Sequence, residues 1–266
     1  MRVAIVGTGS FAKHFIDELP AAGHEIVVLT RSHKDFLDGK KGVVEQRVTD
    51  YSSVAQLAEV FNDCDALVST VFDMKNPSAD THLKLLEACK QTPKCKRFIP
   101  AEYGGNAEDF SEDEENMDSH NAPLKKALRD PKPPDLGTLH PLDLSARTMN
   151  IPGTGNDVFS TTSARDMTKA VAELQKSPNK WRPYTYVQDM ETAWLQLAEL
   201  VKTEGGMPDL KVSFEPVNEI QEALKKKESH FSALVAEFKM LVTTRAARAV
   251  WKELLEAVKQ DPKVVI

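Results

Sequence analysis

Two glycines and an alanine follow the first apolar run of the sequence at a spacing that can hold a phosphate. Gly7, Gly9 and Ala12 form a G-x-G-x-x-A pattern. In such a turn the first glycine permits a sharp bend, the second lets the backbone approach a pyrophosphate, and the small third residue lets the next helix pack closely. N–H groups at the helix N-terminus would then bind the anion. A glycine turn without a ligand is the alternative. The predicted contacts are Gly7, Thr8, Gly9, Ser10, Phe11 and Ala12.

A second candidate site follows the second apolar run. Many dinucleotide-binding folds that select NAD carry an acidic residue there, which binds the ribose 2′-hydroxyl. This sequence has Thr30 and Arg31 instead, followed by Ser32. A guanidinium can contact a 2′-phosphate through two hydrogen bonds, whereas a carboxylate would repel it. We therefore predict NADP(H) rather than NAD(H), with Arg31 and Ser32 at the 2′-phosphate. A solvated loop cation is the alternative for Arg31.

Further candidates lie where the fourth and fifth apolar runs end. Ligands of open α/β sheets bind beyond the carboxyl ends of the strands. Thr70 and Val71 follow one of these runs, and Glu102 and Tyr103 follow the other. We expect all four residues at the cofactor, with Tyr103 also lining the substrate pocket.

A lysine pair is the candidate for acid catalysis. Lys125 and Lys126 lie in the segment 122–129, in which Pro123 fits a helix start. A lysine near the nicotinamide could donate a proton to an oxygen that develops negative charge, particularly if desolvation lowers its pKa. A basic surface helix is the alternative.

Alternating strand and helix patterns must position these residues. Apolar runs rich in β-branched residues predict strands at 2–7, 25–30, 43–50, 66–71 and 97–100. Amphipathic spacing predicts helices at 10–23, 53–61 and 80–91. This order predicts an α/β fold with a doubly wound parallel sheet.

Composition excludes several classes of function. The 266 residues carry a net charge of −6, which argues against nucleic acid as a direct partner. No apolar run is long enough for a membrane span, and the start of the chain reads as a strand rather than a signal peptide. The three cysteines have no metal or redox spacing, so we expect reduced thiols in a cytoplasmic protein. No Tyr-x-x-x-Lys pair, G-x-S-x-G elbow, P-loop or H-E-x-x-H motif occurs, and we expect no metal site.

Four segments together resemble the NmrA-like and isoflavone reductase-like family of atypical short-chain dehydrogenases, particularly its fungal branch. They are "VAIVGTGSFA", "LTRS", "RFIPAEYGGN" and "LKKALR", and the likeness resumes over residues 142–181. The resemblance implies an NADPH-dependent reductase of a phenolic, enone or polyketide-like small molecule. It also implies that the lysine of a K-x-x-x-R helix serves as proton donor. Lys125 with Arg129 matches that register, and Lys126 is the fallback.

The resemblance implies, in addition, that a segment is missing. Family members carry a few dozen more residues after the lysine helix, including a sixth strand that shapes one wall of the substrate pocket. This chain has only "DPKPPDLGTLHP" at 130–141. It could be a shortened enzyme, an NADP(H)-binding regulator of the NmrA type without turnover, or the product of a gene model that lacks an exon.

We therefore predict a Rossmann-like NADP-binding domain over residues 1–130 and a smaller, mostly helical substrate-binding part over 131–266. An apolar stripe within residues 229–260 predicts a helix that packs on its own domain. Alternatively it forms an oligomer contact or a lid, with Phe231, Phe238 and Trp251 at the pocket wall. The expected partners are a small-molecule substrate and a second protein or a second copy of the chain.

Overall fold

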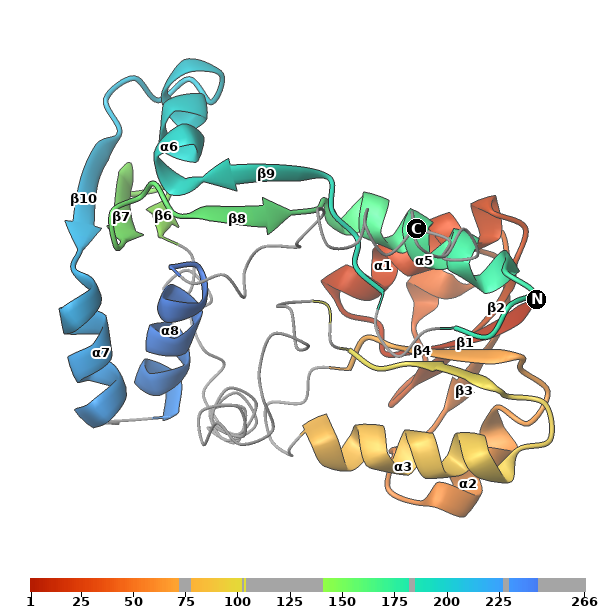
Figure 1. Cartoon of the computed structure of the whole chain (residues 1–266). Helices are drawn as coiled ribbons and strands as arrows, with labels where there is room; N and C mark the ends of the chain where they lie inside the picture. Colours follow the sequence, from red (N-terminus) through yellow and green to blue (C-terminus); the bar gives the residue numbers. More distant parts are fainter. Residues whose placement is uncertain (72–77, 102, 104–140, 182–184, 227–229, 244–266) are drawn as a thin grey trace. The chain divides into compact units, whose positions relative to one another are not determined.

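The computed structural model describes residues 1–71, 78–101, 103, 141–181, 185–226 and 230–243. The chain divides into two compact units, which are described separately (Figure 1). The first unit contains Met1–Tyr103 and Ser163–Trp181. The second contains the described residues from 141 to 162 and from 185 onward.

A parallel sheet forms the centre of the first unit. Its strand order is β3-β2-β1-β4-β5, and each neighbouring pair is parallel. β1, β2 and β4 are almost entirely buried, which is why they appear in the sequence as unbroken apolar runs. The strands are β1 (Arg2–Val6), β2 (Glu25–Thr30), β3 (Val43–Val48), β4 (Ala66–Ser69) and β5 (Arg97–Ile99).

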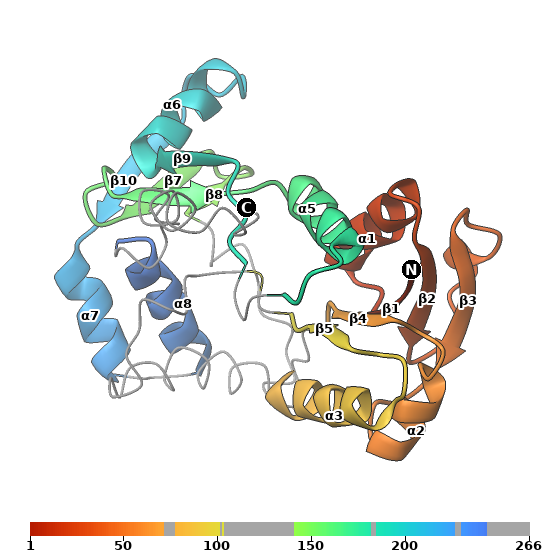
Figure 2. The ribbon, with the colours of Figure 1, turned by 45° about the vertical axis from the view of Figure 1, so that its right-hand side comes forward.

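Helices cover both faces of this sheet (Figure 2). Alternate strand residues point to opposite faces, so Val3 and Ile5 join one apolar cluster while Ala4 and Val6 join the other. The first cluster lies under α1 (Ser10–Ala21) and α5 (Ala164–Lys176), and the second under α2 (Val54–Val60) and α3 (Ser78–Gln91). The predicted doubly wound α/β fold is confirmed, and the predicted strands and helices of the first hundred residues occur within a few residues of their expected bounds.

The helix α5 corrects the predicted domain boundary. The sequence prediction assigned every residue after 130 to the substrate part, but α5 packs on α1, and its Val171 and Ala172 are buried in the core of the first unit. Two hydrogen bonds from the Arg97 guanidinium fix its C-terminal end, one to the carbonyl of Gln175 and one to that of Ser177, both at 2.6 Å. The dinucleotide-binding fold is therefore completed by a segment distant in sequence.

The second unit combines strands and helices. A mixed sheet has the order β10-β7-β6, in which β7 pairs in parallel with β10 and antiparallel with β6. A separate antiparallel pair is formed by β8 and β9. Its core contains Met149, Ile151, Phe159, Trp194, Ala198 and Leu210. The elements are β6 (Leu142–Asp143), β7 (Thr148–Pro152), β8 (Val158–Thr161), β9 (Met190–Ala193), α6 (Trp194–Thr203), β10 (Lys211–Glu215), α7 (Val217–Lys226) and α8 (His230–Leu241).

The second unit thus contains helices together with short strands, where the sequence analysis expected a smaller, mostly helical part. The predicted apolar stripe does form a helix, α8, which packs against α7. Phe238 is 42% exposed, so the stripe is not fully covered within its unit. The side chain of Phe231, all of Trp251 and residues 130–140 of the shortened segment lie outside the described residues. No helix in the described part of the chain is long and apolar enough to cross a membrane.

Candidate functional site

The turn after β1 lies where the direction of winding in the sheet reverses. β1 pairs with β2 on one side and with β4 on the other, and open α/β sheets bind ligands at such switch points. Gly7 has a φ of +101°, a conformation that favours glycine. A Cβ at this position would lie 2.8 Å from Oγ1 of Thr70, and that hydroxyl donates a hydrogen bond to the carbonyl of Val6. The first glycine of the motif is therefore required both by its backbone angle and by its close contact with the end of β4.

The second glycine leaves the N-terminus of α1 open. Gly9 is the N-cap of this helix and, having no side chain, supplies no side-chain cap. The first turn carries no acidic residue, and a Cβ built on Gly9 would meet no atom within 4 Å. An uncapped helix start has free N–H donors and a positive partial charge. The arrangement can therefore accept a pyrophosphate, which is what the sequence motif predicted.

Aromatic packing fixes the rest of this turn. Ala12 is buried against the sheet, and Phe11 packs on Tyr103 with ring centroids 4.8 Å apart. The Tyr103 hydroxyl donates a hydrogen bond to the carbonyl of Ser69 at 2.8 Å, and burial raises the pKa of this phenol well above its usual value. The structure thus places Tyr103 as a packing residue between β4, β5 and α1, with its proton held on a backbone carbonyl.

His82 links the ends of β4 and β5, and the sequence analysis did not single it out. Its Nε2 lies 2.9 Å from the Ser69 hydroxyl and 3.4 Å from the backbone nitrogen of Ala101. A backbone N–H can only donate, so Nε2 is the acceptor and the ring proton is on Nδ1. His82 is the fifth residue of α3, and nothing in the sequence marks it, because its contacts depend on how α3 packs against the sheet. His82 therefore positions the backbone that leads to Tyr103.

Arg31 follows β2 and stacks on a tyrosine. Its guanidinium carbon lies 5.6 Å from the centre of the Tyr51 ring, within the range of a cation–π contact. The Tyr51 hydroxyl donates to the carbonyl of Leu29 at 2.8 Å, and burial raises the pKa of this phenol to about 12. The tyrosine is a fixed, neutral platform beneath an exposed arginine. The sequence alone did not indicate that Tyr51 would lie against Arg31.

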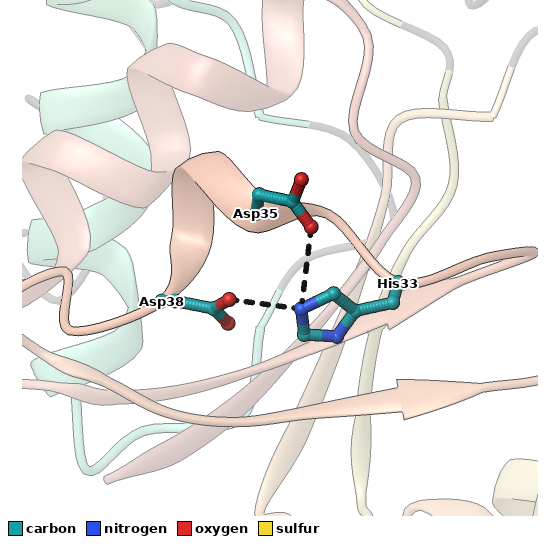
Figure 3. Close-up of side chains that lie close together, drawn as sticks. All are labelled: His33, Asp35 and Asp38. Carbon is teal, nitrogen blue, oxygen red and sulfur yellow. Dashed lines mark hydrogen bonds and ion pairs between the residues drawn. The ribbon is translucent and has the colours of Figure 1, made fainter.

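The loop after Arg31 contains the one group of described residues whose ligand atoms are close enough to hold a metal. Oxygens of Asp35 and Asp38 and a nitrogen of His33 lie within 4.8 Å of one another, and all three residues are exposed. His33 Nε2 already pairs with Asp38 at 2.9 Å and with Asp35 at 3.6 Å (Figure 3). Because His33 Nε2 already hydrogen-bonds to Asp38, the arrangement is a hydrogen-bonded loop. A metal site was not expected from the sequence.

The predicted site residues thus fall into three groups. Gly7 to Ala12, Thr70, Val71 and Tyr103 meet at the carboxyl ends of β1, β4 and β5. Arg31 and Ser32 lie at the same edge of the sheet, after β2. Glu102, Lys125 and Lys126 lie outside the described residues, so the assignment of a catalytic lysine stays a prediction.

Comparison with known proteins also indicates that the first unit binds NAD(P)H. A protein family described as NAD(P)H-binding matches residues 7–132. Over 270 residues the chain is 30% identical to the oxidoreductase swnR of Arthroderma benhamiae, an alignment that includes 92% of this chain and 87% of the relative. The oxidoreductase swnR of Metarhizium robertsii is 29% identical over 272 residues.

A solved structure of similar fold is that of AtPrR2 with NADP+ and (+)pinoresinol. It superposes with a TM-score of 0.69 at 19% identity, over 99% of this chain and 95% of the other. A likeness at this identity supports the fold.

The alignment with the Arthroderma relative also bears on length. It is 270 residues long, but 92% of a 266-residue chain is only about 245 residues. About 25 positions of the aligned relative therefore have no counterpart here.

Proposed function

The chain belongs to the NAD(P)H-dependent oxidoreductases of the NmrA-like and isoflavone reductase-like family, and on this premise we propose that it uses NADPH to reduce a small phenolic, enone or polyketide-like molecule. The first unit would hold the cofactor, and residues beyond Tyr103 would form the substrate side. The ligand of the structural relative, pinoresinol, is a phenolic compound and supports this substrate class.

The observation that carries the proposal is the open N-terminus of α1. Gly9 leaves space beside the helix start, it has no side chain to cap that start, and the first turn of α1 carries no carboxylate. The Gly7 turn presses against Thr70 and holds this helix end at the switch point of the sheet. Gly9, Ser10 and Phe11 would therefore offer backbone N–H groups to the two phosphates.

Selectivity for NADP(H) is supported by the charge at the end of β2. The chain has no carboxylate at Thr30, Arg31 or Ser32, where an NAD-selective site would use one to bind the ribose 2′-hydroxyl. Lys34 adds a second cation near Arg31. The nearby carboxylates of Asp35 and Asp38 both pair with His33. A 2′-phosphate would meet the cations of Arg31 and Lys34.

In the reaction that we propose, the bound cofactor supplies the hydride. Arg31 and the N-terminus of α1 would hold its phosphates, and Thr70 and Tyr103 lie at the carboxyl ends of the neighbouring strands β4 and β5. Lys125 donates the proton to the substrate oxygen, as the family resemblance implies. Tyr103 serves by packing, since its hydroxyl is committed to the carbonyl of Ser69.

A matched pair of lysine variants tests turnover. NADPH consumption is measured on a panel of enones, quinones and phenolic compounds with the wild type, Lys125→Ala and Lys126→Ala. We expect loss of about a hundredfold or more in turnover for Lys125→Ala, with unchanged NADPH affinity, and a small effect for Lys126→Ala. If no compound is turned over while NADP(H) changes the affinity for a protein partner, the chain is a cofactor sensor and the proposed reduction is wrong.

Arg31 tests the choice of cofactor. Arg31→Asp should weaken NADPH binding by roughly tenfold to a hundredfold, because it replaces charge-assisted hydrogen bonds to the 2′-phosphate by repulsion. NADH affinity should stay the same or rise. Lys90→Ala, which removes an exposed cation at the last turn of α3, is the control and should change neither affinity. Equal losses for NADPH and NADH in Arg31→Asp would contradict selectivity at this position.

A further inference from the structure

One side chain of β3 makes a complete set of hydrogen bonds to the loop that follows β2. The Oε1 of Gln46 accepts the backbone N–H of Lys34 at 2.9 Å, and its Nε2 donates to the carbonyl of the same lysine at 3.1 Å. The Gln46 amide thus pairs with both backbone groups of Lys34, much as a neighbouring strand would. The orientation of the amide is fixed by this pairing, since the N–H of Lys34 can only donate and its carbonyl can only accept.

The second N–H of the same amide extends the contact along the loop. Gln46 Nε2 also donates to Oδ1 of Asp38 at 2.8 Å. The other oxygen of Asp38 accepts a hydrogen bond from His33 Nε2 at 2.9 Å (Figure 3). Gln46 and His33 therefore hold opposite sides of one carboxylate, and the loop from His33 to Asp38 is closed on β3.

The cationic end of the loop is fixed by the same contacts. Lys34, whose backbone Gln46 holds, donates from Nζ to the Ser32 hydroxyl at 2.9 Å. The carbonyl of Ser32 accepts a hydrogen bond from the Thr30 hydroxyl, also at 2.9 Å. Ser32 and Lys34 are thereby held next to Arg31, which rests on Tyr51.

We propose that Gln46 is a positioning residue for the 2′-phosphate of NADP(H): it holds the loop in the conformation that presents Arg31, Ser32 and Lys34 together. This inference rests on the proposed selectivity for NADP(H). Gln46 would contribute to that selectivity without belonging to the phosphate site itself. Gln46 itself need not touch the cofactor. Its effect is to remove, before binding, the conformational freedom that the loop would otherwise lose on binding.

Two substitutions separate the contributions of Gln46. Gln46→Glu keeps the size of the side chain but cannot donate to the Lys34 carbonyl or to Asp38, and it places a second carboxylate beside Asp38. Gln46→Ala removes the contacts without adding a charge. Gln91→Glu makes the same chemical change at the exposed C-terminal end of α3, outside this loop, and is the matched control.

The measurement compares two fragments of the cofactor by titration calorimetry. 2′,5′-ADP carries the 2′-phosphate and 5′-AMP does not, so the ratio of their dissociation constants isolates recognition of that phosphate. We expect Gln46→Ala to weaken 2′,5′-ADP binding about tenfold and Gln46→Glu to weaken it further, with 5′-AMP affinity unchanged in both. Retained 5′-AMP binding in the same sample shows that the variant is folded.

The outcomes are distinct for the two proposals. If the wild type prefers 2′,5′-ADP and both Gln46 variants keep that preference, the positioning role is overturned while NADP(H) selectivity stands. A wild type that binds both compounds equally overturns the selectivity and the role of Gln46 together. An equal loss for both compounds in the Gln46 variants also overturns the inference, because it shows a general effect on the fold. Gln91→Glu should behave as the wild type.

Discussion

At the scale of single residues, the geometry of the site depends on how closely β1 approaches the end of β4 at Gly7. Gly7→Ala should destabilise the chain by about 1–3 kcal/mol for its positive φ alone, and further by the contact with Thr70 Oγ1 at 2.8 Å. Gly23 is the control, since it has a φ of +88° and open space around its Cβ position. Thermal unfolding should show the larger loss for Gly7→Ala. Equal losses would mean that the contact with Thr70 has no energetic role.

His82 gives a second prediction at this scale. His82→Phe keeps an aromatic ring in place but leaves the Ser69 hydroxyl and the Ala101 N–H without their acceptor. We expect a loss of about 1 kcal/mol in the free energy of unfolding, the lower end of the usual cost because the site is partly exposed. His14→Phe, the same exchange on α1, should have a smaller effect in the same denaturant titration. An unaltered midpoint for His82→Phe would contradict the positioning role.

The sequence could identify the residues that a ligand contacts, but not the residues that hold them. Gly7, Gly9, Ala12 and Arg31 belong to patterns whose chemistry is local, so their spacing was informative. Tyr51, His82 and Gln46 act through contacts that span 8 to 22 residues of chain, and only the packed structure reveals these contacts. Tyr103 was correctly placed at the ends of the strands, but its hydroxyl is used in packing.

At the scale of elements, a buried histidine couples α5 to the sheet. His24 Nε2 donates to the carbonyl of Ala172 at 2.9 Å, and burial lowers its pKa from the usual value of 6.5. Between that value and the lower folded pKa, the unfolded chain binds more protons than the folded one. The contribution of His24 to the free energy of unfolding is therefore complete above about pH 6.5 and decreases as the pH falls below that value.

His24→Gln tests this dependence, because glutamine can also donate to Ala172 but does not titrate. We expect the difference in free energy of unfolding between the wild type and His24→Gln to decrease as the pH falls from about 7.5 to about 5.5. His14→Gln provides the comparison for a histidine on the surface of α1. A difference that stays constant over this range would contradict the role assigned to His24.

The elements of the first hundred residues were predictable because each strand is a continuous apolar run and each helix has one apolar face. The position of α5 was not predictable in the same way. Its amphipathic pattern indicates a helix with a buried face, but the partner of that face, α1, lies more than 140 residues earlier in the chain. The strands β8, β9 and β10 contain exposed and polar residues rather than continuous apolar runs, so their signal in the sequence is weak and the second unit was expected to be mostly helical.

At the scale of the whole molecule, the first unit requires both of its segments. A fragment of residues 1–130 lacks α5 and exposes the faces of α1 and the sheet that Val171 and Ala172 cover. We expect this fragment to bind a hydrophobic dye such as ANS and to unfold at a lower temperature than a fragment of residues 1–181. A fragment 1–130 that unfolds cooperatively at the temperature of the longer one would restore the boundary predicted from the sequence.

The central claim is that the first unit binds NADP(H) at the open N-terminus of α1. The most direct measurement is an equilibrium titration of the wild type and Gly9→Ala with NADPH and NADH, followed by nucleotide fluorescence. The wild type should bind NADPH more tightly than NADH. Gly9→Ala should lose about tenfold or more for both, because the added methyl group enters the space that the pyrophosphate needs, while stability changes by less than about 1 kcal/mol. Unchanged affinity of Gly9→Ala for NADPH, or a wild type that binds neither nucleotide, would contradict the account.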